Sequence, residues 1–255
     1  MQKLALLASA AFIAGAGMAQ ADQVRIGIAA EPYPPFSSPD AAGNWEGWEI
    51  EIIDAICAAA GLDCAITPTA GDGIIPALIS GRIDAIMTSM TITADRLQSI
   101  DFSDPYYNTP TVIVGQRDME FDATPEGLAG LVLGVQVSTI HQTYAQSYFE
   151  GATELRTYQT QDEANQDLAA GRIDATQADS LALDDFLTTE AGQCCELKGA
   201  VAHAEDILGA GVGAGVRKGD AALREALNRG IAAILADGSY DEITARYFAT
   251  SIYGT

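Results

Sequence analysis

Apolar and polar positions form short alternating blocks along the chain, and these blocks predict strands and helices in turn. Continuous apolar or β-branched runs bounded by turn residues predict buried strands, because a covered strand has no polar face. Such runs lie at 24–29, 64–67, 83–87, 111–115, 131–135, 154–157 and 173–176. Strands that alternate with helical segments are typical of an α/β protein.

Helices are predicted between these strands from apolar spacing and from residues that favour helix ends. The clearest helix starts after Asp220, a good N-cap residue, and runs to Ala236 before Gly238 ends it. A mixed strand-then-helix face from Trp48 ends at Gly61. Further helical stretches lie within 71–80, from 124, from 140 to about 149, and at 161–170, 180–188 and 239–248. Residues 101–107 predict an aromatic loop.

The pentapeptide Gly-Arg-Ile-Asp-Ala occurs twice, at 81–85 and 171–175, and suggests two similar α/β lobes. Each copy precedes a small polar cluster, at 88–91 and at 176–179. In open α/β sheets ligands bind beyond the carboxyl ends of strands, where both clusters are expected to lie. One cluster offers hydroxyls and the other a carboxylate, as a cleft for a small zwitterion needs. The alternative is a shared helix-stop and strand-start signal without function.

The N-terminus has the pattern of an export signal. Lys3 precedes an apolar stretch at 4–18, and Ala19-Gln20-Ala21 fits a small-x-small cleavage site. The alternative, a retained membrane anchor, needs about 20 apolar residues. We therefore expect cleavage after Ala21 and, because Asp22 rather than cysteine follows, a soluble periplasmic chain.

Length and charge limit the classes of partner. Removal of residues 1–21 leaves 255 − 21 = 234 residues, enough for one large domain or two of roughly 100 residues. The leader carries one of the 13 basic residues, so the mature charge is 12 − 35 = −23. Such a charge argues against nucleic acid and anionic lipid as partners, because both would be repelled.

The cysteines and histidines indicate neither a metal nor a cofactor. Cys57 and Cys64 lie seven residues apart across a predicted turn, and a disulfide there is plausible in an oxidising compartment. Cys194 and Cys195 are adjacent, and the sequence leaves three alternatives for them: a vicinal disulfide, two reduced thiols, or burial. His141 and His203 have no metal-ligand spacing, and we expect both at the surface or in loops. The glycines at 209–213 fit a dinucleotide fingerprint only loosely, because no helix opens at them.

Arg96 and Asp179 are the candidate charges of the site. Arg96 either pairs with Asp95 or Asp101 at the surface or grips a carboxylate through two parallel hydrogen bonds. Hydroxyls from the cluster at 88–91 would assist it. Asp179 either caps the following helix or binds an α-ammonium group.

Two further segments offer candidate contacts. Ser138 and Thr139 either cap their helix or offer hydroxyls and N–H groups to an anion. Glu31 and Tyr33 lie on a loop that three prolines make rigid. Tyr33 packs over either the aliphatic part of a ligand or the core.

Six motifs together carry a family resemblance over the whole mature chain. They are Tyr33-x-Pro35-Phe36, Gly81-Arg-Ile-Asp-Ala-Ile86, Thr91-Ile-Thr-x-x-Arg96, Asp101-Phe-Ser-Asp-Pro-Tyr106, Gly134-Val135 with Ser138-Thr139, and Asp237-Gly-Ser-Tyr240. With these motifs the chain resembles the polar amino-acid-binding proteins of bacterial ABC importers, periplasmic solute-binding family 3. The spacing of Cys57 and Cys64 also looks like the first-lobe disulfide of the lysine/arginine/ornithine and histidine binders.

The resemblance implies a Venus-flytrap, that is, two α/β lobes of the periplasmic binding protein-like II type joined by a hinge. The expected segments are a signal peptide at 1–21, lobe 1 at 22–109, lobe 2 at 110–204 and a return to lobe 1 at 205–255. The implied function is a monomeric, non-catalytic receptor that binds a polar or basic L-amino acid, or a derivative, in an interlobe cleft and delivers it to the transmembrane subunits of an ABC permease. The alternatives are a cyclohexadienyl dehydratase-like enzyme and a soluble partner of a chemoreceptor.

The residues that the resemblance implies for the ligand-binding site come from both lobes. Arg96 matches the carboxylate-binding arginine, Asp179 matches the α-amine acceptor, and Glu31 falls at or next to the acidic position of the first loop. The full set is Glu31, Tyr33, Thr88, Ser89, Thr91, Arg96, Gln136, Ser138, Thr139 and Asp179. The chain departs from the family where Gly71 replaces an aromatic residue of the basic-residue binders. Either the pocket lacks the wall that this aromatic residue would form, or another residue supplies it, with Trp48 as the suggested source.

Overall fold

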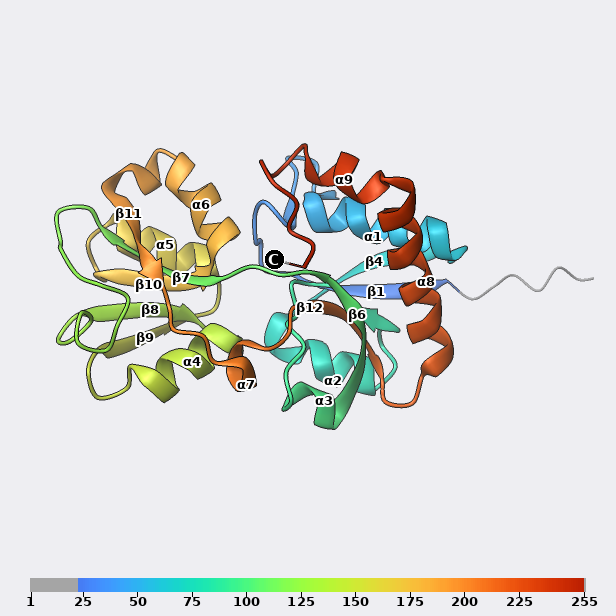
Figure 1. Ribbon diagram of the computed structural model, residues 1–255, viewed down its shortest axis with the longest axis horizontal. Coiled ribbons are helices and arrows are strands. Elements are labelled where there is room, and N and C mark those ends of the chain that lie inside the picture. The colour runs from blue at the N-terminus through green and yellow to red at the C-terminus, as the bar shows by residue number, and fades with distance from the viewer. Residues whose placement is uncertain (1–22, 255) are drawn as a thin grey trace, which may run out of the picture.

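The computed structural model describes residues 23–254, so the predicted leader at 1–21 lies outside the described residues. The described chain forms two lobes side by side, each a five-stranded mixed sheet with helices on both faces (Figure 1). The expected α/β architecture in two lobes is therefore confirmed.

The first lobe contains the sheet of strand order β4-β1-β5-β12-β6. β1 pairs in parallel with β4 and β5, whereas β12 runs antiparallel to β5 and β6. Its strands are β1 (Val24–Ala29), β4 (Cys64–Thr69), β5 (Ala85–Ile86), β6 (Ile100–Tyr107) and β12 (Val212–Arg217). The helices are α1 (Trp48–Ala60), η1 (Gly71–Gly73), α2 (Ile74–Ile79), α3 (Arg96–Ser99), α8 (Ala221–Asp237) and α9 (Ser239–Thr244). A short hairpin joins β2 (Ser38–Pro39) and β3 (Trp45–Glu46).

The second lobe contains the sheet of strand order β11-β7-β10-β8-β9. β8 pairs in parallel with β9 and β10, and β7 runs antiparallel to β10 and β11. Its strands are β7 (Thr111–Gln116), β8 (Val132–Gln136), β9 (Glu154–Tyr158), β10 (Ala175–Asp179) and β11 (Cys195–Ala200). The helices are α4 (Ile140–Tyr148), α5 (Gln161–Ala169), α6 (Ser180–Thr188), η2 (Ala191–Cys194) and α7 (Glu205–Leu208).

The chain crosses between the lobes from β6 to β7 and returns from α7 to β12. Ile207 and Leu208 of α7 pack on the apolar cluster of the second lobe, although α7 belongs to the expected return segment. The exact lobe boundaries at 109/110 and 204/205 stay predictions.

Both copies of the repeated pentapeptide have the same local structure. Gly81 and Gly171 adopt positive φ angles of 75° and 67°, a conformation that glycine adopts without steric cost. Asp84 and Asp174 each accept a hydrogen bond from the N–H at the start of a neighbouring strand, from Arg25 at 3.0 Å and Val132 at 2.8 Å. The pentapeptide itself is therefore a structural signal, and the polar clusters lie beyond it.

The first-lobe core packs α1 and α8 together. Ile52 and Ile56 of α1 and Leu227 and Ile231 of α8 belong to one buried cluster. Gly230 permits the close approach of the helices, because a Cβ atom there would lie 2.4 Å from the Ile56 carbonyl oxygen. This approach fixes α1, and with it the residues of its first turn.

Three local predictions are wrong, and one strand was missed. Residues 101–107 form strand β6 rather than a loop; the strand pattern is hidden because the exposed Asp104 and Pro105 interrupt an otherwise largely buried strand. Residues 124–128 form turns rather than a helix start, and β11 was not predicted. β11 lies at the sheet edge, and its register shifts between Leu197 and Gly199, so its apolar pattern is interrupted. The helix at 239–248 ends earlier, at Thr244.

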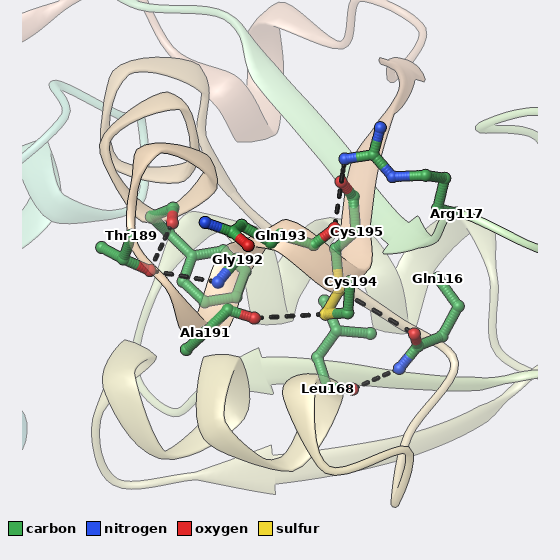
Figure 2. Close-up of a disulfide and its surroundings, with 10 residues drawn as sticks. Gln116, Arg117, Leu168, Thr189, Ala191, Gly192, Gln193, Cys194 and Cys195 are labelled. Atoms are coloured by element: carbon green, nitrogen blue, oxygen red, sulfur yellow. Dashed lines mark hydrogen bonds between the residues drawn. A yellow bond between two sulfur atoms is a disulfide. The ribbon is translucent and has the colours of Figure 1, made fainter.

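Both cysteine pairs form disulfides. Cys57 at the end of α1 bonds Cys64 at the start of β4, as the resemblance implied. Cys194 and Cys195 form a vicinal disulfide, which decides among the three alternatives for this pair (Figure 2). Arg117 binds the backbone of both cysteines: the Arg117 N–H donates to the Cys194 carbonyl at 2.9 Å, and its guanidinium donates to the Cys195 carbonyl at 2.9 Å.

Candidate functional site

One cavity of about 110 Å³ between the lobes brings the predicted ligand-binding residues together. The carboxyl ends of strands from both sheets meet there, since Ala29 ends β1 and Asp179 ends β10. All ten predicted residues line it: Glu31, Tyr33, Thr88, Ser89, Thr91, Arg96, Gln136, Ser138, Thr139 and Asp179. That each of them contacts a ligand stays a prediction.

Arg96 places a cation at one end of this cavity. It begins α3, and its guanidinium Nη1 donates a 2.8 Å hydrogen bond to the Thr91 carbonyl oxygen. Within residues 23–254 no carboxylate forms a salt bridge with it, and Asp101 pairs with Lys218 at 3.0 Å. Burial lowers the pKa of Arg96, yet a guanidinium remains protonated in a protein. The surface-pair alternative is therefore wrong, and a desolvated cation faces the cavity.

Asp179 is the buried carboxylate of the opposite lobe, with 8% of its surface exposed. It precedes α6, but its side chain makes no capping hydrogen bond, so the capping alternative is wrong for the carboxylate. Instead it accepts a 2.7 Å hydrogen bond from the Tyr33 hydroxyl of the first lobe. His141 Nε2 lies 3.6 Å from the same carboxylate oxygen. The anion is thus oriented from two sides.

The N-terminus of α4 borders the same cavity. Thr139 caps this nine-residue helix, because its side chain accepts a hydrogen bond from the Gln142 N–H. Ser138 adopts a positive φ of 61°, unusual for a residue with a side chain, and its N–H donates to Gln142 Oε1 at 2.8 Å. The capping interpretation holds for Thr139, and a helix N-terminus faces the ligand space.

Glu31 and Gly71 form a further wall of the cavity. The Glu31 carboxylate accepts a 3.0 Å hydrogen bond from the Gly71 N–H. A Cβ atom at Gly71 would lie 3.3 Å from Glu31 Oε2, so the absent side chain leaves space beside this carboxylate. Asp72 lines the same region. This wall is acidic where the family pattern has an aromatic ring.

Trp48 does not replace the missing ring. It is fully buried in the first-lobe core, where its indole N–H donates to Thr244 Oγ1 at 3.1 Å. Phe36 lies edge-on to it, and Tyr33 stacks on Phe36 with ring centroids 5.8 Å apart. The suggestion of Trp48 as a pocket wall is therefore wrong, because helix and core packing turn it away from the cavity.

Two residues of the site were missed from sequence. His141 was expected at the surface, yet it lines the cavity with 5% exposure; its place in the first turn after Ser138 was the available signal. Glu49 is 1% exposed and hydrogen-bonded to Ser89, although it does not line the cavity. Its partners lie far away in sequence, so no local pattern marked it. His203 is exposed, as expected.

A second, larger cavity of about 310 Å³ lies on the other side of the Tyr33 loop. Pro32 and Pro34 line it together with residues of α5 and α6, including the carboxylates Asp162 and Asp185. None of its lining residues is cationic, so it offers no charge partner to a ligand carboxylate. Chemistry rather than size therefore favours the smaller cavity.

Residues 23–254 contain neither a membrane-spanning helix nor a metal-ligand cluster. None of the helices in this range has the length and apolarity that a membrane crossing needs. In the same part of the chain, no three side chains from His, Cys, Asp and Glu come together as metal ligands.

Comparisons with known proteins agree with this geometry. Residues 24–250 match the family described as bacterial extracellular solute-binding proteins, family 3. The chain is 40% identical over 259 residues to the L-arginine-binding protein of Pseudomonas aeruginosa, with full coverage of both. An ancestral arginine-binding protein bound to arginine superposes with a TM-score of 0.81, at 30% identity, over 89% of this chain and 98% of that one. An ancestral amino-acid-binding protein described as a precursor of cyclohexadienyl dehydratase gives 0.77, at 29% identity, over 89% and 95%.

Proposed function

The chain belongs to the family 3 bacterial extracellular solute-binding proteins, and on this premise we propose that it is the periplasmic receptor of an amino-acid ABC importer. Its ligand is an L-amino acid held in the interlobe cavity. The arginine-binding relatives support this assignment, and the cavity supplies the chemistry.

The observation that carries the proposal is the pair of opposite charges across one cavity. Arg96 offers a guanidinium without a salt-bridge partner among the described residues, and Asp179 offers a buried carboxylate. A zwitterion fits both, with its carboxylate at Arg96 and its ammonium group at Asp179. The hydroxyl-bearing Thr91 and the N-terminus of α4 add donors for the carboxylate.

We propose further that the ligand side chain is cationic. Glu31 and Asp72 line the cavity beside the space that Gly71 leaves, and neither forms a salt bridge within the described part of the chain. A guanidinium or ammonium group there would donate charge-assisted hydrogen bonds to the Glu31 carboxylate. The added space also admits a basic amino acid that carries a substituent.

Binding is proposed to favour the closed form of the two lobes. Tyr33 already reaches from the first lobe to Asp179 of the second, so the cavity has walls from both. A ligand that contacts both lobes binds the closed form better and shifts the population toward it. The permease then receives the closed, loaded receptor.

Calorimetry on the refolded, ligand-free chain 22–255 tests the proposal. The chain is refolded because ligand bound during expression must first be removed. The panel of ligands is arginine, lysine, ornithine, histidine, glutamine, glutamate and opines. We expect selective binding of the cationic members and a rise in the unfolding midpoint by mass action. Binding of glutamate in preference to arginine would contradict the proposal that the ligand side chain is cationic. If no member of the panel binds, the receptor assignment itself is contradicted.

We propose no catalytic step for this chain. The carboxylates that line the cavity, Glu31, Asp72 and Asp179, are accounted for by ligand charge, and the 40% identical relative is a binding protein. Turnover of prephenate or arogenate by the purified chain would overturn this and favour the dehydratase alternative.

Export and assembly belong to the same proposal. Cleavage after Ala21 predicts a mature protein that begins at Asp22, which intact-mass measurement of the exported chain checks. A monomer is expected by light scattering with and without ligand.

A further inference from the structure

Glu49 is a charged side chain in a place that normally excludes charge. It lies in the first turn of α1 and is 1% exposed. Burial of an unpaired carboxylate costs free energy unless hydrogen bonds compensate it. Within residues 23–254 no Lys, Arg or His forms a salt bridge with it. Its compensation must therefore come from neutral donors.

Three donors converge on this carboxylate. The Ser89 N–H donates to Oε1 at 2.7 Å, and the Ser89 hydroxyl donates to Oε2 at 3.1 Å. The Tyr106 hydroxyl donates to Oε1 from strand β6. Because two of the three bonds come from Ser89, Glu49 holds both the backbone and the side chain of that residue.

Ser89 has a conformation that needs such support. Its φ is 52°, in the left-handed region that non-glycine residues rarely adopt. Thr88, the residue before it, is tied by a 2.8 Å hydrogen bond from the Ala29 N–H to its hydroxyl. The cavity-lining segment 88–91 is thus fixed from behind by β1 and α1.

The contacts also decide what Ser89 offers to a ligand. Its two donors, the N–H and the O–H, both point to Glu49, so only acceptor atoms remain for the cavity. An acceptor backed by a carboxylate attracts an ammonium group and repels a carboxylate. Asp179, which also lines the cavity, presents the second anion.

We propose that Glu49 is a positioning residue that makes Ser89 an acceptor for the ligand's α-ammonium group. This inference rests on the proposed function, since it assigns one half of the zwitterion site. Glu49 acts through Ser89 and does not touch the ligand. The electrostatic contribution of its carboxylate reaches the ammonium group through one hydroxyl and one peptide unit.

Two ligands separate this role from a general structural one. L-Arginine carries all three charged groups, whereas desamino-arginine keeps the carboxylate and guanidinium but lacks the ammonium group. Calorimetry would compare both ligands on wild type and Glu49→Gln, because glutamine keeps the size of the side chain but not its charge. We expect Glu49→Gln to weaken arginine binding by about tenfold or more and desamino-arginine binding by less than about threefold.

A matched control is Glu51→Gln, two residues further along α1. Glu51 pairs with Arg246 and Tyr247 and does not line the cavity. Its loss should leave the affinity for both ligands within about twofold of wild type. Should Glu49→Gln fail to fold, Ser89→Ala serves instead, because it removes the hydroxyl acceptor and keeps the backbone bond to Glu49.

The outcomes are distinct. Equal losses for the two ligands in Glu49→Gln or, if that variant does not fold, in Ser89→Ala would show a structural role and overturn the inference. Unchanged arginine affinity would overturn it as well. Wild type that binds neither arginine nor any other amino acid would contradict the proposed function itself, and the inference would fall with it.

Discussion

The Tyr33 hydroxyl of the first lobe donates a 2.7 Å hydrogen bond to the Asp179 carboxylate of the second lobe. Tyr33 is held by stacking on Phe36 in the core, and Asp179 ends strand β10. Burial and the nearby charge of Asp179 raise the pKa of Tyr33 well above its usual value, so the phenol stays a donor at neutral pH. The bond links the rigid loop of one lobe to the ligand-binding carboxylate proposed in the other.

Tyr33→Phe tests the value of this bond. Asp179 would lose a hydrogen bond that orients it, and a buried acceptor left with fewer partners is destabilised by about 1 kcal/mol. We expect the affinity for arginine to fall by roughly five- to tenfold in calorimetry, with the stacking on Phe36 retained. Unchanged affinity would mean that the ligand itself orients Asp179.

Arg96→Ala should weaken amino-acid binding far more. A buried ligand carboxylate would lose its charged partner, a loss of about 2–5 kcal/mol in binding free energy. The matched control is Arg82→Ala, an exposed arginine of the first pentapeptide repeat, which should bind as wild type does. Calorimetric affinity for Arg96→Ala equal to that of the control would remove Arg96 from the site.

The buried Glu49 carboxylate should make the stability of the ligand-free protein depend on pH. Burial raises the pKa of Glu49, and the bonds from Tyr106 and Ser89 only partly oppose this. A group with a higher pKa in the folded chain contributes stability below its unfolded pKa, and this stability is lost as the pH rises through the folded pKa. Wild type should therefore lose stability relative to Glu49→Gln as the pH rises above the ordinary pKa of a glutamate side chain.

Urea unfolding of both proteins, at pH values from below to above the ordinary glutamate pKa, measures the difference. Glu51→Gln, which removes a carboxylate from the more exposed face of the same helix, separates this effect from the general charge repulsion of a chain with formal net charge −22. A free-energy difference between wild type and Glu49→Gln that stays constant with pH would show that Glu49 titrates alike in the folded and unfolded chains.

Gly230→Ala tests the contact between α1 and α8. Alanine favours a helix over glycine by about 1 kcal/mol, which alone would stabilise the protein. The new Cβ, however, would lie 2.4 Å from the Ile56 carbonyl oxygen, and backbone atoms in a packed core cannot yield cheaply. We expect net destabilisation by about 1–3 kcal/mol in urea unfolding.

The control for this substitution is Gly73→Ala. Its φ is −101°, and nothing lies within 4 Å of the added Cβ. Its unfolding free energy should stay within about 0.5 kcal/mol of wild type. A Gly230→Ala protein as stable as this control would show that the two helices separate without cost.

The linear pattern of residues determined much of this protein. Asp220 and Gly238 bound α8 as expected, because capping depends on contacts within one helical turn. Continuous apolar runs marked seven strands of the two sheets, although not β6 or β11, because a strand covered on both faces consists of consecutive apolar residues. The motifs around Arg96 and Ser138 indicated the family and with it the residues that line the cavity.

The tertiary structure alone decided which of these residues meet and what each offers. Tyr33 and Asp179 are 146 residues apart, and Glu49 lies 40 residues from Ser89 and 57 from Tyr106. The spacing of apolar and polar residues does not predict such pairs, because each pair depends on how the sheets and helices pack. Burial likewise turned Trp48 into the core and His141 toward the cavity. The charge of Glu49 is tolerated only because packing brings donors from distant segments to it.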